Sequence, residues 1–406
     1  MKKRLLNILS IYTSTFKGLS KDIWAVATIY LINRTGEMVL PFMSLYLINQ
    51  LGFSMTQSAI VLSSFGAGAL VGSNLGGYLT DRLGNFKVML ISLIGSGIGY
   101  NMILAFDSFI PLCCWMILTA IFTSMFSPAA FGAVGKWGNP KFQTRGYSLL
   151  RMAINLGIAI GGYIGGHLAE FVGYHWLFII DGATCFIAAG ALFIVLNHRN
   201  TSEIISREVA QTGRSPYKDK HLMTFLFLNL LNMVVFFQII FSVPVYFKDV
   251  LGLEEKLIGT FFMANGIMVL LLEMPVIFRI EQSGKLFKPI AVGALLVGAG
   301  YASLHLTNLP MIAIILFSVL VAIGEVVNFP LIPSIAMRRA AEHNQGQYMG
   351  VVSTMFAMAF LLAPISGLPL IEKIGWEPYW TIAMTLSLIS FVGLTILFRI
   401  KKTEYL

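Results

Sequence analysis

Residues 109–135 read FIPLCCWMILTAIFTSMFSPAAFGAVG, a stretch that contains no charged side chain. A helix rises about 1.5 Å per residue, so about 20 apolar residues can cross a hydrocarbon core about 30 Å thick. Because lipid offers the backbone no hydrogen-bond partner, such a run must be a helix. Runs of this kind predict twelve spans, at 23–49, 57–80, 87–106, 109–135, 146–170, 175–197, 222–247, 257–280, 288–306, 310–337, 347–371 and 377–399.

The composition is that of a membrane protein. Apolar residues make up 57% of 406 positions, charged residues make up 12%, and the mean hydropathy is +0.79. A soluble chain carries about 25% charged residues. Alternating segments of about 10 residues, which a membrane β-barrel requires, are missing from the sequence. We therefore expect an all-α membrane protein with twelve transmembrane helices in two pseudo-symmetric six-helix bundles.

The net charge of +9 raises the question of a nucleic-acid partner, but the positions of the cations argue against one. A nucleic-acid protein gathers its cations on one soluble face. Here the Lys and Arg clusters all fall on one side of a chain that crosses twelve times, and the other side holds only Lys248, Lys256 and Lys373. By the positive-inside rule, we expect both termini in the cytoplasm. The expected location is the cytoplasmic (inner) membrane.

One polar segment divides the chain into near-equal halves. We expect an amphipathic lead-in at 1–22, a six-helix bundle at 23–197, a cytoplasmic linker at 198–221, a second bundle at 222–399 and a tail at 400–406. Six plus six helices is the parallel-repeat plan of secondary transporters, with the solute site near the midplane between the halves. The expected partners are a small-molecule substrate, protons and the lipid bilayer, and we expect a monomer.

Glycine rows stand in two spans and predict close helix packing, with a hinge as the alternative. Small residues four apart let helix backbones approach where lipid supplies no hydrophobic drive. In span 57–80 the row is Gly66, Gly68, Gly72, Gly76 and Gly77, and in span 146–170 it is Gly157, Gly161, Gly162, Gly165 and Gly166.

After span 57–80 comes Gly77-Tyr-Leu-Thr-Asp81-Arg82-Leu-Gly84-Asn85-Phe86-Lys87. This segment resembles the signature G-x-x-x-D-R-x-G-R-[RK] of the major facilitator superfamily, between its second and third helices. Asn85 stands where the family usually has Arg. The resemblance implies the major facilitator fold and a loop that holds the outward-open state. The gating residues it implies are Gly77, Asp81, Arg82, Gly84 and Lys87.

The row from Gly157 to Gly166 resembles the antiporter signature G-x-x-x-G-P-x-x-G-G of the drug:proton antiporters in that superfamily. Gly162 stands in the position of the proline. The resemblance to the superfamily covers essentially the whole chain. It implies export of drug-like solutes in exchange for protons.

Ionisable residues within the spans are costly unless they are paired or line a cavity, so they indicate function. In span 23–49, Arg34 and Glu37 are three residues apart and share a helix face, as do Asn33 and Glu37. One reading is a neutralising pair that never titrates. We favour a proton-carrying carboxylate, whose neutral form is favoured by burial and whose charged form is favoured by Arg34.

The second half holds a similar set. Glu325 and Asn328 share a face of span 310–337, and the resemblance places this span and span 23–49 beside a central cavity. Glu273 is a third candidate proton carrier, with pairing to a cation as the alternative. Arg151 either reaches the cytoplasm, binds an anionic solute or pairs with an acid, whereas Asp181 is expected to have a structural partner.

Span 222–247 combines a stripe of phenylalanines with amide side chains. An aromatic stripe is more often packing or lipid contact, but a lipid-facing helix has no use for Asn232 and Gln238. An amphipathic cavity wall suits apolar or cationic organic solutes. The predicted substrate-binding residues are Asn33, Arg34, Asn232, Gln238, Asn328 and Arg151.

The sequence carries neither a Walker-type phosphate loop nor a metal-ligand cluster, so we expect no enzyme activity, no metal and no cofactor. The energy source would be a proton gradient. The expected function is export of lipophilic or cationic solutes by drug:proton antiport. The alternative is a proton symporter that imports a peptide-like or anionic solute, with Arg34 and Arg151 as the anion clamp. A non-transporting scaffold or receptor is the third reading.

Overall fold

The computed structural model describes residues 18–138, 143–199, 216–283, 286–306, 308–339 and 345–400. Most of the predicted lead-in, most of the linker and most of the tail therefore lie outside the described residues. Within the described ranges the chain is helical throughout, with short connections and no strand. The expected all-α fold is confirmed.

Each predicted span has a helical counterpart. Ten helices of the described part are long and apolar enough to cross a membrane, α12 is shorter, and the first span is split in two. The elements along the chain are α2 (Lys21–Thr35), α3 (Val39–Leu45) and η1 (Tyr46–Gln50), α4 (Met55–Leu83), α5 (Asn85–Ile103), α6 (Phe109–Trp137), α7 (Gln143–Phe171), α8 (His175–Leu196), α9 (Lys220–Phe241), α10 (Val243–Val245) and η5 (Tyr246–Val250), α11 (Glu255–Ser283), α12 (Phe287–Ser303), α13 (Pro310–Asn328) and α14 (Leu331–Arg339), α15 (Gln345–Ile374) and α16 (Trp376–Ile400).

The chain forms two compact units. Unit 1 comprises Met1–Val39, Ala67–Ile205 and Glu255–Met263, and unit 2 comprises Leu40–Gly66, Ser206–Glu254 and Ala264–Leu406. Each unit thus consists mainly of one predicted half and takes one short segment from the other half. The predicted domain boundaries themselves remain predictions.

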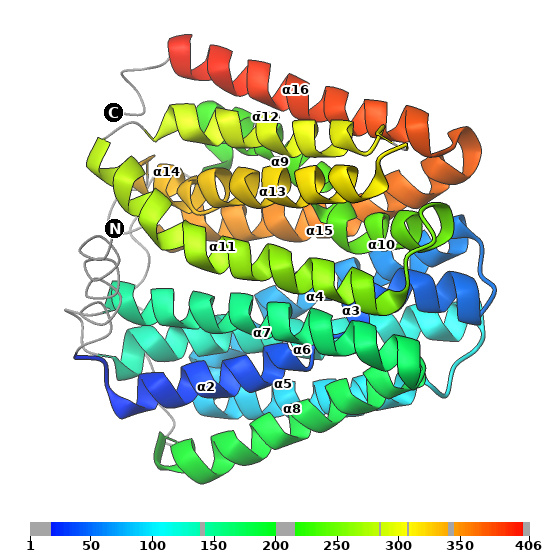
Figure 1. The fold of residues 1–406 in the computed structure, drawn as a ribbon. Helices are drawn as coiled ribbons and strands as arrows, with labels where there is room; N and C mark the ends of the chain where they lie inside the picture. Colours follow the sequence, from blue (N-terminus) through cyan, green and yellow to red (C-terminus); the bar gives the residue numbers. More distant parts are fainter. Residues whose placement is uncertain are drawn as a thin grey trace, which may run out of the picture. The chain divides into compact units, whose positions relative to one another are not determined.

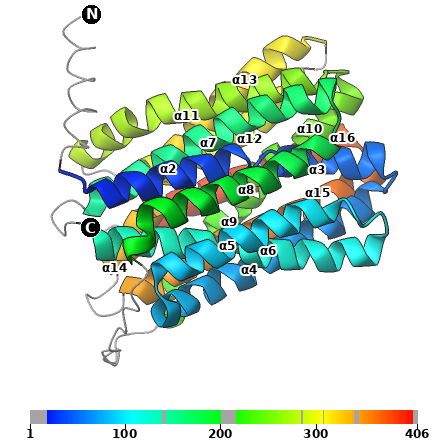
Figure 2. The same cartoon turned by 90° about the horizontal axis from the view of Figure 1, so that it is seen from below.

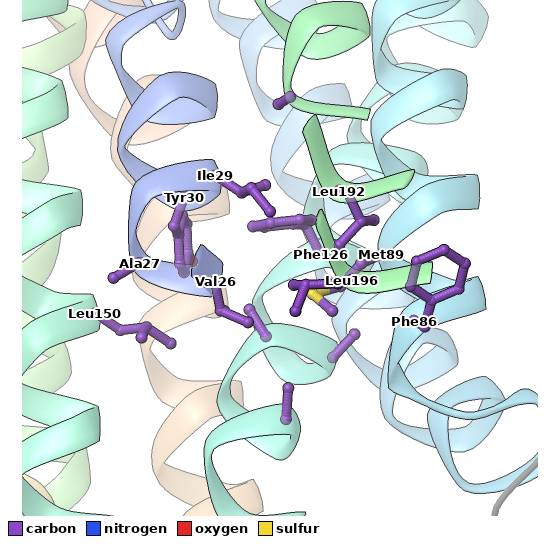
Figure 3. Packing of buried hydrophobic residues seen from close by; sticks show 14 of the residues in the cluster. Val26, Ala27, Ile29, Tyr30, Phe86, Met89, Phe126, Leu150, Leu192 and Leu196 are labelled. Atoms are coloured by element: carbon purple, nitrogen blue, oxygen red, sulfur yellow. The ribbon is translucent and has the colours of Figure 1, made fainter. Parts of the chain in front are cut away.

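The core of unit 1 is an apolar cluster contributed by α2, α5, α6, α7 and α8 (Figure 3). Tyr30 of α2 packs edge to face on Phe126 of α6, with ring centroids 4.9 Å apart. Figure 2 shows α5 running beside α6 and α8, and these pairs are in contact. The aromatic pair joins α2 to α6 beside Arg34, one of the residues predicted to function on α2.

Unit 2 has its own core, to which α9, α12, α14 and α15 contribute. In this unit α12 lies between α13 and α16 (Figure 1). Gly293 and Gly324 mark the α12–α13 crossing, since a Cβ on Gly293 would lie 2.7 Å from the Gly324 carbonyl oxygen. Asp219, the N-cap of α9, accepts two hydrogen bonds of 2.8 Å from Arg339 of α14.

One corner is repeated almost unchanged 200 residues later. After a break, each first helix of a half ends in a π-helical turn, Tyr46–Gln50 or Tyr246–Val250. Gly52 (φ +69°) and Gly252 (φ +66°) follow, in a left-handed conformation that favours glycine. Both corners lie in unit 2, where Asn49 Nδ2 is 3.5 Å from Asp249 Oδ1. This repeat supports an internal duplication of the halves.

The glycine row of α4 lies where α4 packs on α6. A Cβ on Gly68 would lie 2.3 Å from the carbonyl oxygen of Ile117, and one on Gly72 would lie 2.3 Å from that of Ile121. Four-residue spacing on both helices thus brings backbone against backbone, as the packing interpretation expects. Gly77 differs, because a Cβ there meets nothing within 4 Å.

We predict that Gly72→Ala lowers the thermal unfolding temperature, because its methyl group must push α4 away from α6. Overpacking of this kind costs about 1–3 kcal/mol. Gly77→Ala is the matched control on the same helix and should leave the unfolding temperature unchanged or slightly raised, since alanine is the better helix former. Thermal unfolding of both purified variants in detergent checks this. Equal unfolding temperatures for the two variants would contradict the packing role.

Candidate functional site: the break in the first span

The first predicted span is not one continuous helix. It breaks at residues 36–38, between α2 and α3, so the expectation of a single helix over 23–49 was wrong. The break is tightly surrounded. A Cβ on Gly36 would lie only 1.7 Å from Thr184 Oγ1, and one on Gly157 of α7 would lie 2.5 Å from Arg34 Cβ. Only glycine at these positions lets α7 and α8 approach the break so closely.

Asp181 of α8 makes the break tolerable. Its Oδ1 accepts a hydrogen bond of 3.1 Å from the Met38 N–H, and its Oδ2 accepts one of 3.1 Å from the Val39 N–H. A helix that restarts leaves its first N–H groups without intrahelical partners, and inside a bilayer no water can supply them. Asp181 is 1% exposed and supplies the acceptors. Its expected structural partner is thus the backbone of α3.

The Arg34 guanidinium forms an ion pair with the Glu37 carboxylate at this break. Both side chains are largely buried, with exposures of 16% and 12%. Arg34 Nη2 is also 3.5 Å from the Tyr30 hydroxyl, and the guanidinium lies 5.2 Å from the centre of that ring. The contact predicted from their spacing is present, although Glu37 lies in the turn after α2 and not on its helical face.

Asn33 faces α8. Its Nδ2 donates to Cys185 Sγ over 3.5 Å. Cys185 follows Asp181 by four residues on α8. The break, its capping acid, the ion pair and this amide thus all belong to unit 1. What the arrangement can do chemically is clear: protonation of Glu37 removes its negative charge and with it the ion pair to Arg34.

The amide residues of the second half hydrogen-bond to neighbouring helices inside unit 2. Asn328 Nδ2 donates to the Ile290 carbonyl oxygen at 2.7 Å and lies 3.4 Å from Asn229 Oδ1, so it links α13, α12 and α9. Asn232 Oδ1 accepts from the Ser387 hydroxyl of α16 at 3.3 Å.

Gln238 of α9 makes separate hydrogen bonds, to α15 and to the residue that follows α9. Its Nε2 donates to the Ala363 carbonyl oxygen of α15 at 2.6 Å, and its Oε1 accepts from the Ser242 hydroxyl. Asn232, Gln238 and Asn328 are fully buried. Their contact with a solute remains a prediction, whereas their role in joining helices is visible.

The other charged candidates are half-buried. Glu325 lies on α13, one turn before Asn328, and Glu273 lies on α11 beside Pro275, both in unit 2. Arg151 is in the third turn of α7, in unit 1. Of the predicted coupling and binding residues, the structure brings Asn33, Arg34 and Glu37 together at the break within unit 1.

The signature after span 57–80 spans the end of α4 and the start of α5. Asp81 and Arg82 are exposed in the last turn of α4, and Arg82 lies 4.4 Å from the centre of the Tyr78 ring. Gly84 has φ +86°, a conformation that requires glycine. Asn85, in place of the usual Arg, is buried and donates to the Ala129 carbonyl oxygen at 2.8 Å. Lys87 is half-buried in the first turn of α5.

The glycine row of α7 packs on two different partners. A Cβ on Gly161 would lie 2.8 Å from the Thr35 carbonyl oxygen, beside the break. On the neighbouring positions, a Cβ on Gly162 would lie 2.7 Å from Phe262 Cβ and one on Gly166 would lie 2.5 Å from the Glu255 carbonyl oxygen. Gly165 is also buried. The row thus brings both α2 and the first turns of α11 against α7.

We predict that Asp181→Asn loosens the break. The Met38 and Val39 N–H groups each donate to one carboxylate oxygen, whereas asparagine has a single side-chain oxygen. Its amide nitrogen is a donor and would face one of these two N–H groups. Loss of a hydrogen bond to a charged group costs about 1.5–3 kcal/mol. Hydrogen exchange at the Met38 and Val39 amides should become faster, and the unfolding temperature should fall.

Thr184→Val is the matched control, because it keeps the side-chain shape next to Gly36. The Thr184 hydroxyl donates only to the Asp181 carbonyl oxygen of its own helix, at 2.9 Å. Exchange at Met38 and Val39 should therefore stay slow in this variant. Unchanged exchange in Asp181→Asn would show that the carboxylate does not hold the break.

Within the described residues, no His, Cys, Asp and Glu side chains gather into a group that could hold a metal ion. The comparisons with known proteins concern transport. The chain is 22% identical over 379 residues to the uncharacterized MFS-type transporter YttB of Bacillus subtilis, covering 92% of this chain and 94% of that protein. It is 22% identical to a Na(+), Li(+), K(+)/H(+) antiporter of Planococcus maritimus, covering 87% and 89%.

A third relative is the multidrug resistance protein MdtH of Proteus mirabilis, 24% identical with 77% of each chain covered. Among solved structures, a POT family transporter in complex with 5-aminolevulinic acid superposes with a TM-score of 0.79 at 18% identity, covering 96% of this chain and 97% of that chain. This likeness shows the fold. The model of the Major Facilitator Superfamily matches residues 24–364 and 288–405. With the helical fold and these relatives, the match establishes that the chain belongs to the Major Facilitator Superfamily and is a membrane transporter, not an enzyme.

Proposed function

We propose that this protein is a proton-coupled secondary transporter that works by alternating access of its two halves and exports lipophilic or cationic organic solutes in exchange for protons. The observation that carries the proposal is the buried Arg34–Glu37 ion pair at the break of the first span. A buried ion pair is weak support for stability, since two charges have lost their hydration. Placing one inside a span is more easily explained by a function that uses its charge.

The geometry links proton binding to a change of contacts. When Glu37 binds a proton, it no longer neutralises Arg34, and the buried guanidinium must find another partner or become accessible to water. Because Glu37 lies in the turn between two helices, the surrounding backbone has fewer intrahelical hydrogen bonds to lose. We propose that this is the step by which proton binding favours one state of the transport cycle, with Glu325 and Glu273 as further candidate carriers.

The relatives support antiport. One relative is named as an antiporter of monovalent cations and protons, and another as a multidrug resistance protein. The aromatic and amide residues of α9 suit a solute with apolar and cationic parts. In this proposal the segment from Gly77 to Lys87 holds the outward-open state, the protein is a monomer in the cytoplasmic membrane, and both termini are cytoplasmic.

A second candidate function is proton symport of a peptide-like or anionic solute. The observation that favours it is a pair of arginines within the spans of unit 1, Arg34 and Arg151, which suit an anion better than a cation. The symport reading also agrees with the fold of the POT family transporter, although a likeness at 18% identity shows the fold alone. The ion pair argues for antiport, because Arg34 is already occupied by Glu37.

We predict that Glu37→Gln folds and inserts normally but loses transport driven by a pH gradient. The amide keeps the shape of the side chain and cannot titrate. Flux into proteoliposomes should fall to the level of empty liposomes when the gradient is the driving force, while exchange of solute without a gradient continues. Glu325→Gln is the comparison variant with the same chemical change in the other half. Full gradient-driven transport by Glu37→Gln would refute Glu37 as the proton carrier.

The direction of coupling has its own test. Proteoliposomes with an internal pH dye receive external tetraphenylphosphonium, a lipophilic cation, or dialanine, a small peptide. An antiporter drives protons out as the cation enters, so the interior should become more alkaline with tetraphenylphosphonium and stay unchanged with dialanine. Internal acidification upon dialanine entry would overturn antiport in favour of the symporter.

A further inference from the structure

A short sequence at the end of α7 is repeated at the end of α15. The first copy is Leu168-Ala-Glu170-Phe-Val-Gly173-Tyr174 and the second is Leu370-Ile-Glu372-Lys-Ile-Gly375-Trp376. In both copies the glycine ends the helix in a left-handed conformation, with φ +106° and +83°. The signal of the repeat in the sequence is Leu-x-Glu-x-x-Gly followed by an aromatic residue, which occurs in both halves.

The glutamate of each copy caps the start of another long helix. In unit 1, Glu170 Oε2 accepts a hydrogen bond of 3.0 Å from the N–H of Glu255, the first residue of α11. In unit 2, Glu372 Oε2 accepts one of 2.9 Å from the N–H of Thr56, the second residue of α4, and one from its hydroxyl. A carboxylate at a helix N-terminus makes charge-assisted hydrogen bonds and is favoured by the helix dipole.

The two caps are reciprocal with respect to the halves of the sequence. A glutamate of the first half, Glu170, holds a helix of the second half, and Glu372 of the second half holds a helix of the first. These contacts help explain why each compact unit includes a short segment from the other half. The chain separation is large, 85 residues for one cap and 316 for the other, so neither is a local capping motif.

Close backbone packing continues from each cap along the same helix pair. In unit 1 a Cβ on Gly259 would lie 2.6 Å from the Gly162 carbonyl oxygen. In unit 2 a Cβ on Gly66 would lie 2.6 Å from Leu361 Cα, and the Ser63 hydroxyl donates to the Leu361 carbonyl oxygen at 2.9 Å. Each cap therefore closes the end of a helix–helix contact that joins the two halves, α7 with α11 and α4 with α15.

We propose that Glu170 and Glu372 are a pair of equivalent latches that hold these two contacts closed in one state of the transport cycle and release them in the other. The proposal rests on alternating access by the two halves, which is part of the proposed function. If the halves move as bodies, the α7–α11 and α4–α15 contacts join the same two bodies, so both must open together. The competing reading is two ordinary helix caps that stabilise α11 and α4 independently.

The two contacts are not identical in their surroundings. At α11, the buried Glu255 side chain accepts a further bond of 2.7 Å from the Tyr174 hydroxyl. At α4, Trp376 takes the place of Tyr174 and packs on Tyr246 with ring centroids 5.2 Å apart. The side chain that caps the next helix is a glutamate at both sites, which makes this residue the element to test.

The test is hydrogen–deuterium exchange on the full-length protein in lipid nanodiscs, read at the first turns of α11 and α4. Glu170→Gln and Glu372→Gln keep the side-chain shape and replace a charged acceptor by a neutral one. If they are latches, each variant should speed exchange at both helix starts, including the one that it does not touch, by about fivefold for a loss of about 1 kcal/mol. Faster exchange confined to the helix whose cap was changed would overturn the proposal.

Ser54→Ala is the matched control at α4. Ser54 and Gln57 cap this helix from its own sequence, since the Ser54 hydroxyl accepts from the Gln57 N–H at 3.1 Å and the Gln57 side chain accepts from the Ser54 N–H at 3.0 Å. Its loss should speed exchange at α4 only. A cross-effect of Ser54→Ala on α11 as large as that of Glu372→Gln would also contradict a specific latch.

Two further measurements keep the outcome clear. Should Glu170→Gln fail to fold, Glu170→Asp retracts the carboxylate by one methylene and keeps its charge, and it should show the same cross-effect. Transport by Glu37→Gln is measured separately. Retained proton coupling in that variant refutes Glu37 as the carrier and leaves the exchange result standing, whereas purely local exchange refutes the latches and leaves the Glu37 result standing.

Discussion

The requirement that every backbone polar group find a partner without water governs this structure. It forces the apolar runs into helices, and it also sets where a helix can stop. The first span breaks only where Asp181 accepts the Met38 and Val39 N–H groups. At the starts of α4 and α11, glutamates from distant parts of the chain also accept backbone N–H groups. A buried capping acid thus accompanies the break of the first span.

Glycine supplies the second constraint. In lipid, apolar side chains gain little by leaving their surroundings for one another, so helices associate through close packing and through hydrogen bonds. The α4 row meets the backbone of α6, and the α7 row meets both the break and the start of α11. The acids could not reach their N–H partners if larger residues held these helices apart. Packing and capping are therefore two parts of one arrangement.

The functional residues show how far residue type alone can lead. The spacing of Arg34 and Glu37 predicted their contact, and the structure contains it. The amides of α9 were assigned to a solute because a lipid-facing helix does not need them. Gln238 and Asn232 each have a partner within unit 2, at Ala363 and Ser387, whereas the Asn232 amide nitrogen is buried with no hydrogen-bond partner among the described residues. Composition indicates that a helix is polar inside, but it does not say whether protein or solute satisfies it.

The sequence by itself determined the all-α fold and the number and approximate limits of the spans, because a bilayer leaves so apolar a backbone no other way to pair its polar groups. It also contained the duplicated segment with Glu170 and Glu372, but the sequence did not show which groups the two glutamates contact. Only the tertiary structure decided which N–H groups these acids cap and that the first span breaks at residues 36–38. The reason is distance along the chain. Asp181 is 143 residues from Met38, and only the packing of α8 beside α2 brings that carboxylate to the break.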